Sequence, residues 1–265
     1  MKKIILSVVI LSICSLSAHA QFGKALKNSK IINAASKTAQ SFTISDADIH
    51  QYCNEYIQWM DTHNPLCKST DKDAGKQACA KRLANIVSIL PADIVKQHRL
   101  DIQPYYVIDM NAFACANGSI RVFAGLMEKM TDDQILAVVC HEIGHVVNKD
   151  SKNAFVTALR ISALKDAAGS VAGSTAAALT DSQLGSLAES LSKAQFSQKQ
   201  ESQADAYSYE LLKKLGKNPS QMASSLEVLL KMQQEAGSVE QSKYKQLFSS
   251  HPNLKTRIEE LGKRQ

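Results

Sequence analysis

The stretch 139–146, VCHEIGHV, places two histidines and a glutamate inside an otherwise apolar run. Burying three such groups without partners is costly, so they either form a satisfied core patch or bind a ligand. His141 and His145 are four residues apart, about 40° around a helix and roughly 6 Å along it, so both imidazoles face one point. Such a pair can hold one Zn²⁺ ion.

Glu142 points to one side of this histidine pair. There it can take a proton from an attacking water and pass it to a leaving amine, which are the general-base and general-acid roles of peptide hydrolysis. The H-E-x-x-H pattern would arise by chance roughly once in a hundred chains of this composition. Two histidines do not make a catalytic zinc site, because a third protein ligand is required.

The candidate third ligand lies downstream, in the stretch ESQAD at 201–205. Glu201 and Asp205 share one face of a predicted helix at a four-residue spacing. Glu201 could complete the ligand set, while Asp205 could accept the other N–H of a ligand histidine and fix its tautomer. A solvated acidic face is the alternative for these two carboxylates. Their occurrence together with HEIGH favours the metal site, with one Zn²⁺ per chain.

The rest of the sequence predicts an α+β domain that is mostly helical and contains one small sheet. Apolar residues recur at helical spacing in 46–61, 76–97, 131–148, 151–168, 181–215, 220–236 and 252–262. Pro91 should kink or divide the second of these segments. Runs typical of strands occupy 105–108, 112–116 and 119–123, and Asn117-Gly118 is a hairpin signal between the last two. The small-residue stretch 169–178 is interpreted as a loop or lid near the site.

The first twenty residues have the organisation of a secretory signal, with two lysines, an apolar run, and Ala18-His19-Ala20 as a cleavage site. A lipoprotein box ending at Cys14 is the less favoured alternative, because Ile13 stands where a small residue is expected. No later segment approaches eighteen uninterrupted apolar residues, so no transmembrane segment is predicted in the mature chain. We therefore expect a periplasmic or exported protein, cleaved after Ala20.

Charge and cysteine content give two further expectations. The formal net charge of +6 falls to about +4 when the two signal lysines are removed, an excess too diffuse to indicate nucleic-acid binding. Five cysteines follow the signal, and an exported protein can oxidise them. Cys67 and Cys79 bracket a polar loop and are the first candidates for a pair, although the sequence does not fix the connectivity among Cys53, Cys67, Cys79, Cys115 and Cys140.

Four segments together resemble a known family. They are NAFACANGSIRVFAGLM before the predicted zinc helix, HEIGHVVNKD within it, ESQADAYSYELL, and SHPNLKTRIEEL near the end of the sequence. In this order they resemble the zinc metallopeptidases of the HtpX and CAAX prenyl endopeptidase family, most closely its compact exported members from Gram-negative bacteria. The resemblance implies a zincin-type metallopeptidase domain over 46–265, after a signal peptide (1–20) and an N-terminal arm (21–45).

The resemblance also implies a role for each residue that matches the metal-site motifs. His141, His145 and Glu201 would be the zinc ligands. Glu142 would be the catalytic glutamate, and Asp205 would orient a ligand histidine.

A further segment resembles the edge strand of the small sheet, which borders the active-site cleft. It consists of Asn111, Ala112, Phe113, Ala114, Cys115, Ala116, Asn117 and Gly118. A substrate in extended conformation would add to this edge through backbone hydrogen bonds. Such binding recognises the main chain of the substrate, so it suits unfolded or extended protein substrates.

His251-Pro252 and Arg257 resemble a C-terminal element that lies beside the active site in the family, and both count here as candidate catalytic residues. His251 could donate a hydrogen bond to the oxyanion of the reaction, or could cap zinc in a resting state. The structural alternative for His251 is a helix-cap residue before Pro252 at a first helical position. Arg257 could instead only pair with a carboxylate.

The resulting hypothesis is a zinc-dependent endopeptidase that hydrolyses peptide bonds in unfolded or misfolded envelope proteins, as part of protein quality control. Outer-membrane assembly or quality-control proteins would be its partners. The alternative is a chaperone-like or assembly-binding module with a closed, rarely active zinc site. A purely structural zinc site is disfavoured, because three ligands beside a glutamate leave one coordination position open.

Overall fold

The computed structural model of the chain describes residues 44–165, 178–235 and 241–264. The predicted signal peptide, all but the last two residues of the predicted arm, and the predicted lid up to residue 177 lie outside the described residues. The described residues all fall in one unit, Ile44–Gln265.

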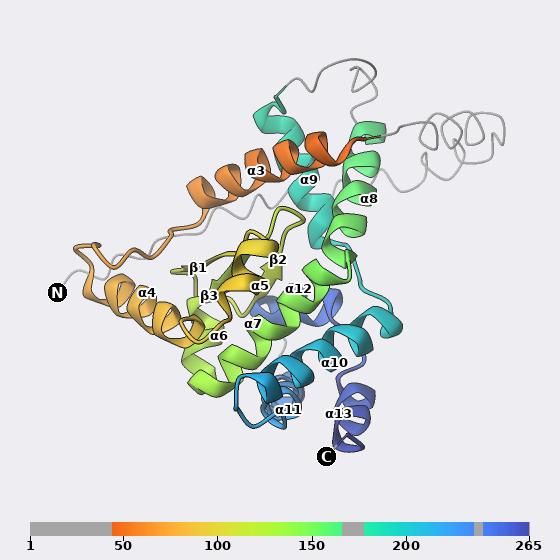
Figure 1. Ribbon diagram of the computed structural model, residues 1–265. Coiled ribbons are helices and arrows are strands. Elements are labelled where there is room, and N and C mark those ends of the chain that lie inside the picture. The colour runs from red at the N-terminus through yellow and green to blue at the C-terminus, as the bar shows by residue number, and fades with distance from the viewer. Residues whose placement is uncertain (1–43, 166–177, 236–240, 265) are drawn as a thin grey trace. The chain divides into compact units, whose positions relative to one another are not determined.

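Helices make up most of the described residues (Figure 1). They are α3 (Asp46–His63), α4 (Ala74–Val87), α5 (Ala92–Gln97), α6 (Ala124–Lys129), α7 (Asp132–Val147), α8 (Asp150–Lys165), α9 (Asp181–Ser192), α10 (Gln198–Lys214), α11 (Gln221–Glu235), α12 (Gln241–Ser250) and α13 (Leu254–Gly262). The prediction of a mostly helical α+β domain is confirmed. Among the described residues, no helix combines the length and the apolar character needed to cross a bilayer.

One mixed sheet contains the three described strands, β1 (Asp101–Tyr105), β2 (Ala112–Ala114) and β3 (Ser119–Phe123). The central strand β3 pairs in parallel with β1 and antiparallel with β2, so β2 forms one edge. The predicted hairpin is confirmed: Gly118, at a φ of +92°, donates its N–H to the carbonyl of Cys115 at 3.0 Å. A positive φ explains the glycine at this turn position.

The strand predicted at 105–108 is wrong in its position, because β1 ends where the predicted run begins. Tyr105 pairs with Phe123, the last residue of β3, and beyond it β1 has no strand to pair with. The chain turns instead around the start of α6, where the N–H of Gly125 donates to the carbonyl of Val107 at 2.9 Å. A Cβ on Gly125 would lie 2.1 Å from the carbonyl oxygen of Ile108, so this close approach requires glycine.

Helix boundaries follow local capping signals more closely than apolar periodicity. Pro91 separates α4 from α5, as predicted. The segment predicted to be helical over 181–215 is broken at 193–197, because Ser197 begins a new helix by capping α10. The N–H of Phe196, just before this cap, donates to the carbonyl of Ser250 at 3.1 Å. This tertiary contact holds the break and cannot be inferred from local sequence.

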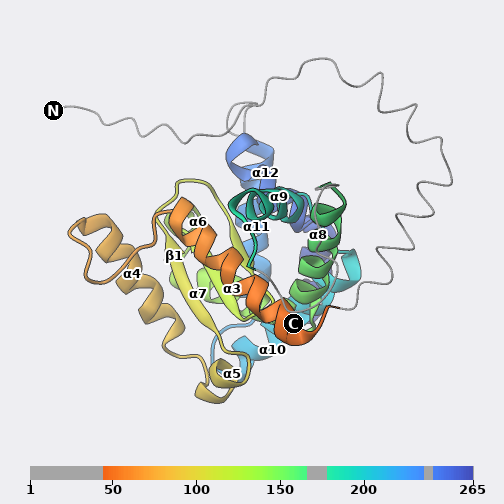
Figure 2. The same ribbon diagram turned by 90° about the horizontal axis from the view of Figure 1, so that it is seen from above.

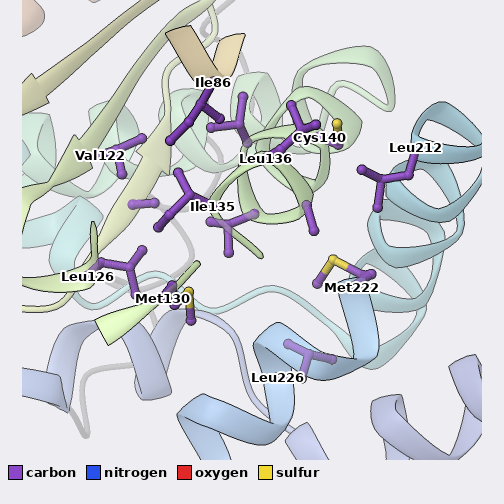
Figure 3. Close-up of a cluster of buried hydrophobic side chains, with 14 of the residues drawn as sticks. Ile86, Val122, Leu126, Met130, Ile135, Leu136, Cys140, Leu212, Met222 and Leu226 are labelled. Atoms are coloured by element: carbon purple, nitrogen blue, oxygen red, sulfur yellow. The ribbon is translucent and has the colours of Figure 1, made fainter. Parts of the chain in front are cut away.

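Helix α7 runs through the larger hydrophobic core, which explains its apolar sequence. Figure 3 shows Ile135 and Leu136 of α7 between the sheet residue Val122 and the side chains of Leu212 and Leu226, which come from α10 and α11. Twelve residues of α7 are buried, including all three polar residues of HEIGH. Burial of this part of the helix means that the polar groups of HEIGH must find partners inside the protein.

A second, smaller core joins α3, α8 and α9. It contains Cys53, Tyr56, Phe155 and Leu187, and the rings of Tyr56 and Phe155 meet edge to face at 5.9 Å. Cys115, one residue beyond β2, belongs to the same cluster. The first residues of α3 lie beside α8 in both Figure 1 and Figure 2. The second core therefore packs against the edge-strand side of the sheet.

Candidate metal centre and active site

Three separate parts of the chain meet at one buried cluster. Helix α7 supplies His141 and His145, α10 supplies Glu201, and the connection between α12 and α13 supplies His251. One ligand atom from each of these four buried side chains lies within 4.8 Å of the others. The structure thus brings together the three predicted zinc ligands and one of the two predicted C-terminal residues.

The distances within this cluster fit a single small metal ion. The Nε2 atoms of His141 and His145 are 3.1 Å apart, and Oε1 of Glu201 lies 3.2 Å from Nε2 of His145. Oε2 of Glu201 lies 3.7 Å from Nε2 of His141. Two ligand atoms bound to one tetrahedral Zn²⁺ at about 2.0–2.1 Å are about 3.3 Å apart, close to these separations. Two imidazoles and one carboxylate also form a donor set found in catalytic zinc sites.

The packing of α7 against α10 brings these ligands together. A Cβ on Gly144 would lie 3.0 Å from Cα and 3.1 Å from the carbonyl oxygen of Ala204, so the two helices touch backbone to backbone. Glycine between the two histidines thus permits the approach that carries Glu201 to them. A hydrogen bond from the hydroxyl of Ser208 to the carbonyl of Ala137, at 2.8 Å, joins the same helices.

Each ligand histidine has a carboxylate on its other ring nitrogen. Nδ1 of His141 lies 2.9 Å from Oδ1 of Asp205, the contact that the sequence predicted. Nδ1 of His145 lies 3.1 Å from Oδ2 of Asp150, which in turn accepts a hydrogen bond from Nε2 of Gln200 at 2.9 Å. With Nδ1 protonated and donating, Nε2 of each ring is left as the free lone pair that a metal requires.

Asp150 was missed by sequence reasoning. It stands five residues after His145 and begins α8, so it does not share a face of α7 with the histidine at a regular helical spacing. Lys149, at a φ of +63°, turns the chain between the two helices and brings Asp150 back to the ring. The only available signal was an acidic residue shortly after the helix that carries the two histidines.

Arg257 contacts the carboxylates of Glu201 and Asp205. The residue is 1% exposed. Its guanidinium forms a bidentate salt bridge with Asp205, in which Nε donates at 2.7 Å and Nη2 at 2.6 Å. Its Nη1 also pairs with Oε2 of Glu201. Arg257 thus makes the carboxylate contacts expected from its structural alternative. These contacts orient Glu201 and Asp205, and Arg257 does not line the cavity described below.

These contacts shift the pKa values of the buried groups. Burial lowers the pKa of His145, but hydrogen bonds to Asp150 and Glu201 outweigh it and raise that pKa to about 9. Burial lowers the pKa of His141 and prevails over the opposing effect of Asp205. Burial raises the pKa of Glu201, but the positive charges of His251 and Arg257 and a hydrogen bond from His145 leave it well below its usual range. Glu201 is thus an ionised carboxylate, as a metal ligand must be.

Glu142 lies at the wall of a cavity of about 90 Å³ next to the cluster. Its side chain is almost fully buried, and its Oε1 lies 3.7 Å from Nε2 of His251, which also lines the cavity. Large apolar and aromatic side chains make up much of the rest of its lining: Tyr56, Met60, Phe113, Phe155, Leu191 and Phe196. A carboxylate and an imidazole thus face an apolar space beside the candidate metal ligands.

The predicted edge-strand segment contributes only its first part to this cavity. Asn111, Ala112, Phe113, Ala114 and Cys115 line it. The remaining three residues form the turn that leads to β3: Ala116, Asn117 and Gly118. The amide of Asn117 binds the side chain of Asn54 at 2.8 Å. The substrate-binding prediction is therefore consistent in position for the first five residues and not for the last three.

His251 belongs to the cluster and does not cap a helix. Its Nδ1 lies 3.0 Å from Oε1 of Glu201. Helix α13 begins at Leu254, with Asn253 as its N-cap residue, so Pro252 does not occupy a first helical position. The structural alternative for His251 was wrong for this reason. Phe196, which sequence reasoning also missed, stacks on the ring of His145 at a centroid distance of 4.0 Å and lies 5.3 Å from the ring of His251.

Comparisons with known proteins point to the same chemistry. Residues 82–265 match the family model described as peptidase family M48. Metalloprotease LoiP of Escherichia coli (strain K12) is 37% identical over 234 residues, which cover 88% of this chain and 87% of that protein. Metalloprotease YcaL of the same organism is 31% identical over 264 residues, covering 100% and 98%. Protease HtpX of Actinobacillus pleuropneumoniae serotype 5b is 44% identical over 54 residues, or 19% of each chain.

Proposed function

The chain belongs to peptidase family M48 and is a metalloendopeptidase, and we propose from this premise that one Zn²⁺ ion serves it in cleaving unfolded or misfolded proteins of the cell envelope. His141, His145 and Glu201 would hold the ion. One observation carries the proposal: three buried ligand atoms converge beside Glu142, on the wall of a cavity that β2 also lines.

Glu142 is the residue to which we assign proton transfer. When bound, the ion would act as a Lewis acid that polarises the scissile carbonyl and lowers the pKa of water. The carboxylate of Glu142 takes the proton of the attacking water and delivers it to the leaving nitrogen. Its position on the cavity wall, outside the cluster of four possible ligands, leaves this side chain available for the exchange.

The cavity and the edge strand support an extended substrate with apolar side chains. β2 pairs with β3 on one side only among the described strands, so its other edge can accept the main chain of a substrate. The aromatic wall of the cavity accepts an apolar side chain near the scissile bond. Unfolded proteins offer both features, because their main chain and their apolar residues are exposed together.

We place this activity in the periplasm or outside the cell, on the basis of the N-terminal signal and its cleavage site after Ala20. Residues 1–20 would be removed, residues 21–45 would form an arm, and residues 46–265 would form the peptidase domain. Proteins of outer-membrane assembly or quality control are the partners that we propose there.

The decisive test couples zinc quantification to cleavage of casein, with and without a chelator. Glu142→Gln should retain about one zinc per chain and lose roughly 10²–10⁴-fold in activity, because only proton transfer is removed. Glu201→Ala should lose zinc and activity together. Glu210→Gln, which alters an exposed glutamate on the same helix as Glu201, is the matched control and should change neither. Full casein cleavage by the Glu142→Gln protein would contradict the mechanism.

A second candidate function is favoured by one specific observation. His251 supplies a fourth possible ligand atom within the same 4.8 Å, which would suit a closed zinc site in a chaperone-like or assembly-binding module. His251→Ala separates the two candidates. A capping histidine predicts faster casein cleavage by the variant, whereas a donor to the oxyanion predicts a loss of roughly 10²–10³-fold.

A further inference from the structure

Two thiols outside the metal site lie in contact in the second core. Cys53 of α3 is fully buried, and Cys115, one residue beyond β2, is 4% exposed. Both cysteines belong to the same buried cluster, and the Cys115 thiol and the backbone of Ala116 and Asn117 are among the groups that interact with the thiol of Cys53. In this structure both residues are free cysteines.

The residues around this pair hold the same two segments together. Asn54, next to Cys53 in α3, accepts a 2.8 Å hydrogen bond from the side chain of Asn117 in the β2–β3 turn. The N–H of Cys115 donates to the carbonyl of Ser119 at 2.8 Å, which fixes the position of the thiol relative to the hairpin. Two neighbouring thiols, on segments joined by the Asn54–Asn117 hydrogen bond, need little movement to form a covalent bond.

We propose that Cys53 and Cys115 form a disulfide bond in the exported protein, and that this bond fixes the end of the edge strand beside the cavity. The second part rests on the proposed function, because it assumes that β2 holds the substrate. β2 contains only three residues, and Cys115 directly follows it and lines the cavity. A covalent link from Cys115 to α3 would therefore limit the movement of a short strand that otherwise depends on β3.

The chemistry is a thiol–disulfide exchange with an external disulfide, either an oxidoreductase or a small-molecule disulfide. The thiolate of one cysteine attacks the donor disulfide, forming a mixed disulfide and releasing one donor thiol. The second cysteine then attacks the first cysteine's sulfur and releases the other donor thiol. Overall, the two cysteines lose two protons and two electrons, and the donor disulfide is reduced to two thiols.

Burial restricts when this exchange can take place. It raises the pKa of the Cys53 thiol far above its usual range, so the folded protein contains almost no thiolate at this position. The bond should therefore form during folding, before α3 packs over the hairpin. Once formed, it should resist reductants until the protein unfolds.

The other cysteines provide internal comparisons. Cys67 and Cys79, the pair suggested by the sequence, are also free thiols, and neither lines the cavity; the thiol of Cys79 donates to Sδ of Met127 at 3.7 Å. Cys140 lies in α7, where burial raises the pKa of its thiol to about 12. Cys140 is then the unpaired member of the five cysteines that follow residue 20.

Disulfide mapping tests the bond without reference to activity. The mature protein is isolated from the oxidising compartment without reductant, alkylated in denaturant, digested and analysed by mass spectrometry. We expect the peptide with Cys53 linked to the peptide with Cys115, and Cys140 alkylated. Alkylated Cys53 and Cys115 in most of the folded protein, or a link from either to another cysteine, would overturn the proposal.

The effect on the edge strand is tested with Cys53→Ala, since Cys53 does not line the cavity. Loss of a typical disulfide should lower Tm by about 5–15 °C in a domain of this size. KM for an extended peptide should rise several-fold, while kcat and zinc content stay constant. Cys79→Ala is the control and should leave KM unchanged.

The outcomes of these measurements are separable. A mapped disulfide with an unchanged KM in Cys53→Ala would overturn the role in the edge strand and leave the proposed function standing. Absence of cleavage by the oxidised, zinc-loaded parent protein would instead defeat the proposed function, while the mapped bond and the Tm shift would still support the disulfide.

Discussion

Each of the two predicted zinc-binding histidines has a carboxylate against its Nδ1 atom. The two carboxylates come from different parts of the chain. Asp205 contacts His141 from one turn beyond the third ligand, and Asp150 contacts His145 from the start of α8. A carboxylate in this position fixes the tautomer and orientation of a ligand imidazole. The geometry of the centre therefore depends on residues that would not touch the ion.

Asp150 allows this dependence to be measured. Asp150→Asn leaves only one acceptor oxygen for both the ring of His145 and the amide of Gln200, and it removes the negative charge. We expect zinc affinity to fall by about 10–100-fold, as determined by competition with a chelator of known affinity. Asp93→Asn, at an exposed site on α5, is the control. Equal affinities for the two variants would show that Asp150 does not orient the ligand.

At the level of single residues, the sequence predicted the side chains that lie on regular helical spacings. His141, His145 and Glu201 meet as expected, because two motifs on two helices fix them. Asp150 and Phe196 could not be predicted in the same way, since Asp150 follows a turn at the start of α8 and Phe196 lies in the break before α10. Their positions follow from the turn at Lys149 and from a long-range backbone hydrogen bond to Ser250.

The contact between α7 and α10 is the element-scale feature on which the centre rests. Gly144→Val would place side-chain atoms against the backbone of Ala204 and push α10 away, which moves Glu201 from the histidines. Overpacking of this kind costs about 1–3 kcal/mol. We expect a lower Tm and weaker zinc binding, measured by thermal unfolding and chelator competition.

A matched glycine makes this prediction specific to the contact. Gly185 also lies in a helix, α9, but a Cβ at this position would meet no atom within 4 Å. Gly185→Val should therefore leave zinc affinity unchanged and alter Tm only slightly. If the two substitutions weaken zinc binding equally, close helix packing at Gly144 is not the cause.

At the scale of elements, the prediction was accurate where a local signal marks a boundary. Thr131 caps α7 and Pro91 divides α4 from α5, and both features can be recognised in the sequence. Strand β1 was misplaced because its limits depend on the length of β3, which is distant in the chain. The break before α10 also carries a local signal, the capping box of Ser197 and Gln200, which the prediction of one helical segment over 181–215 overlooked.

At the scale of the whole described unit, two hydrophobic cores support two different parts of the site. The larger core contains α7 and α10, which carry the predicted ligands, whereas residues of the smaller core line the apolar wall of the cavity. Metal binding and substrate binding should therefore respond to different core substitutions.

Leu212→Ala and Leu187→Ala form a matched pair for this prediction. Both leucines are fully buried, Leu212 on α10 in the larger core and Leu187 on α9 in the smaller one. Each substitution should cost about 2–5 kcal/mol of unfolding free energy. We expect Leu212→Ala to weaken zinc binding, and Leu187→Ala to raise KM at full zinc occupancy. The reverse assignment would contradict the division between the cores.

Metal removal should destabilise the whole peptidase unit. An ion held by α7 and α10 favours the folded state by mass action, and at a hundredfold excess over its Kd it should raise Tm by about 5–10 °C. A chelator should remove this increment, as measured by differential scanning calorimetry. In Glu201→Ala the chelator should have no effect. An equal chelator shift in that variant would place the stabilising ion elsewhere.

The position of Arg257 in the chain has a consequence for the order of events during biosynthesis. Every predicted ligand precedes it, yet its guanidinium pairs with both Glu201 and Asp205 in the folded protein. A nascent chain shorter than 257 residues carries the HEIGH motif but leaves these two carboxylates buried without their cation, a costly arrangement. The charge pairing behind the centre therefore cannot be completed until residue 257 has been synthesised.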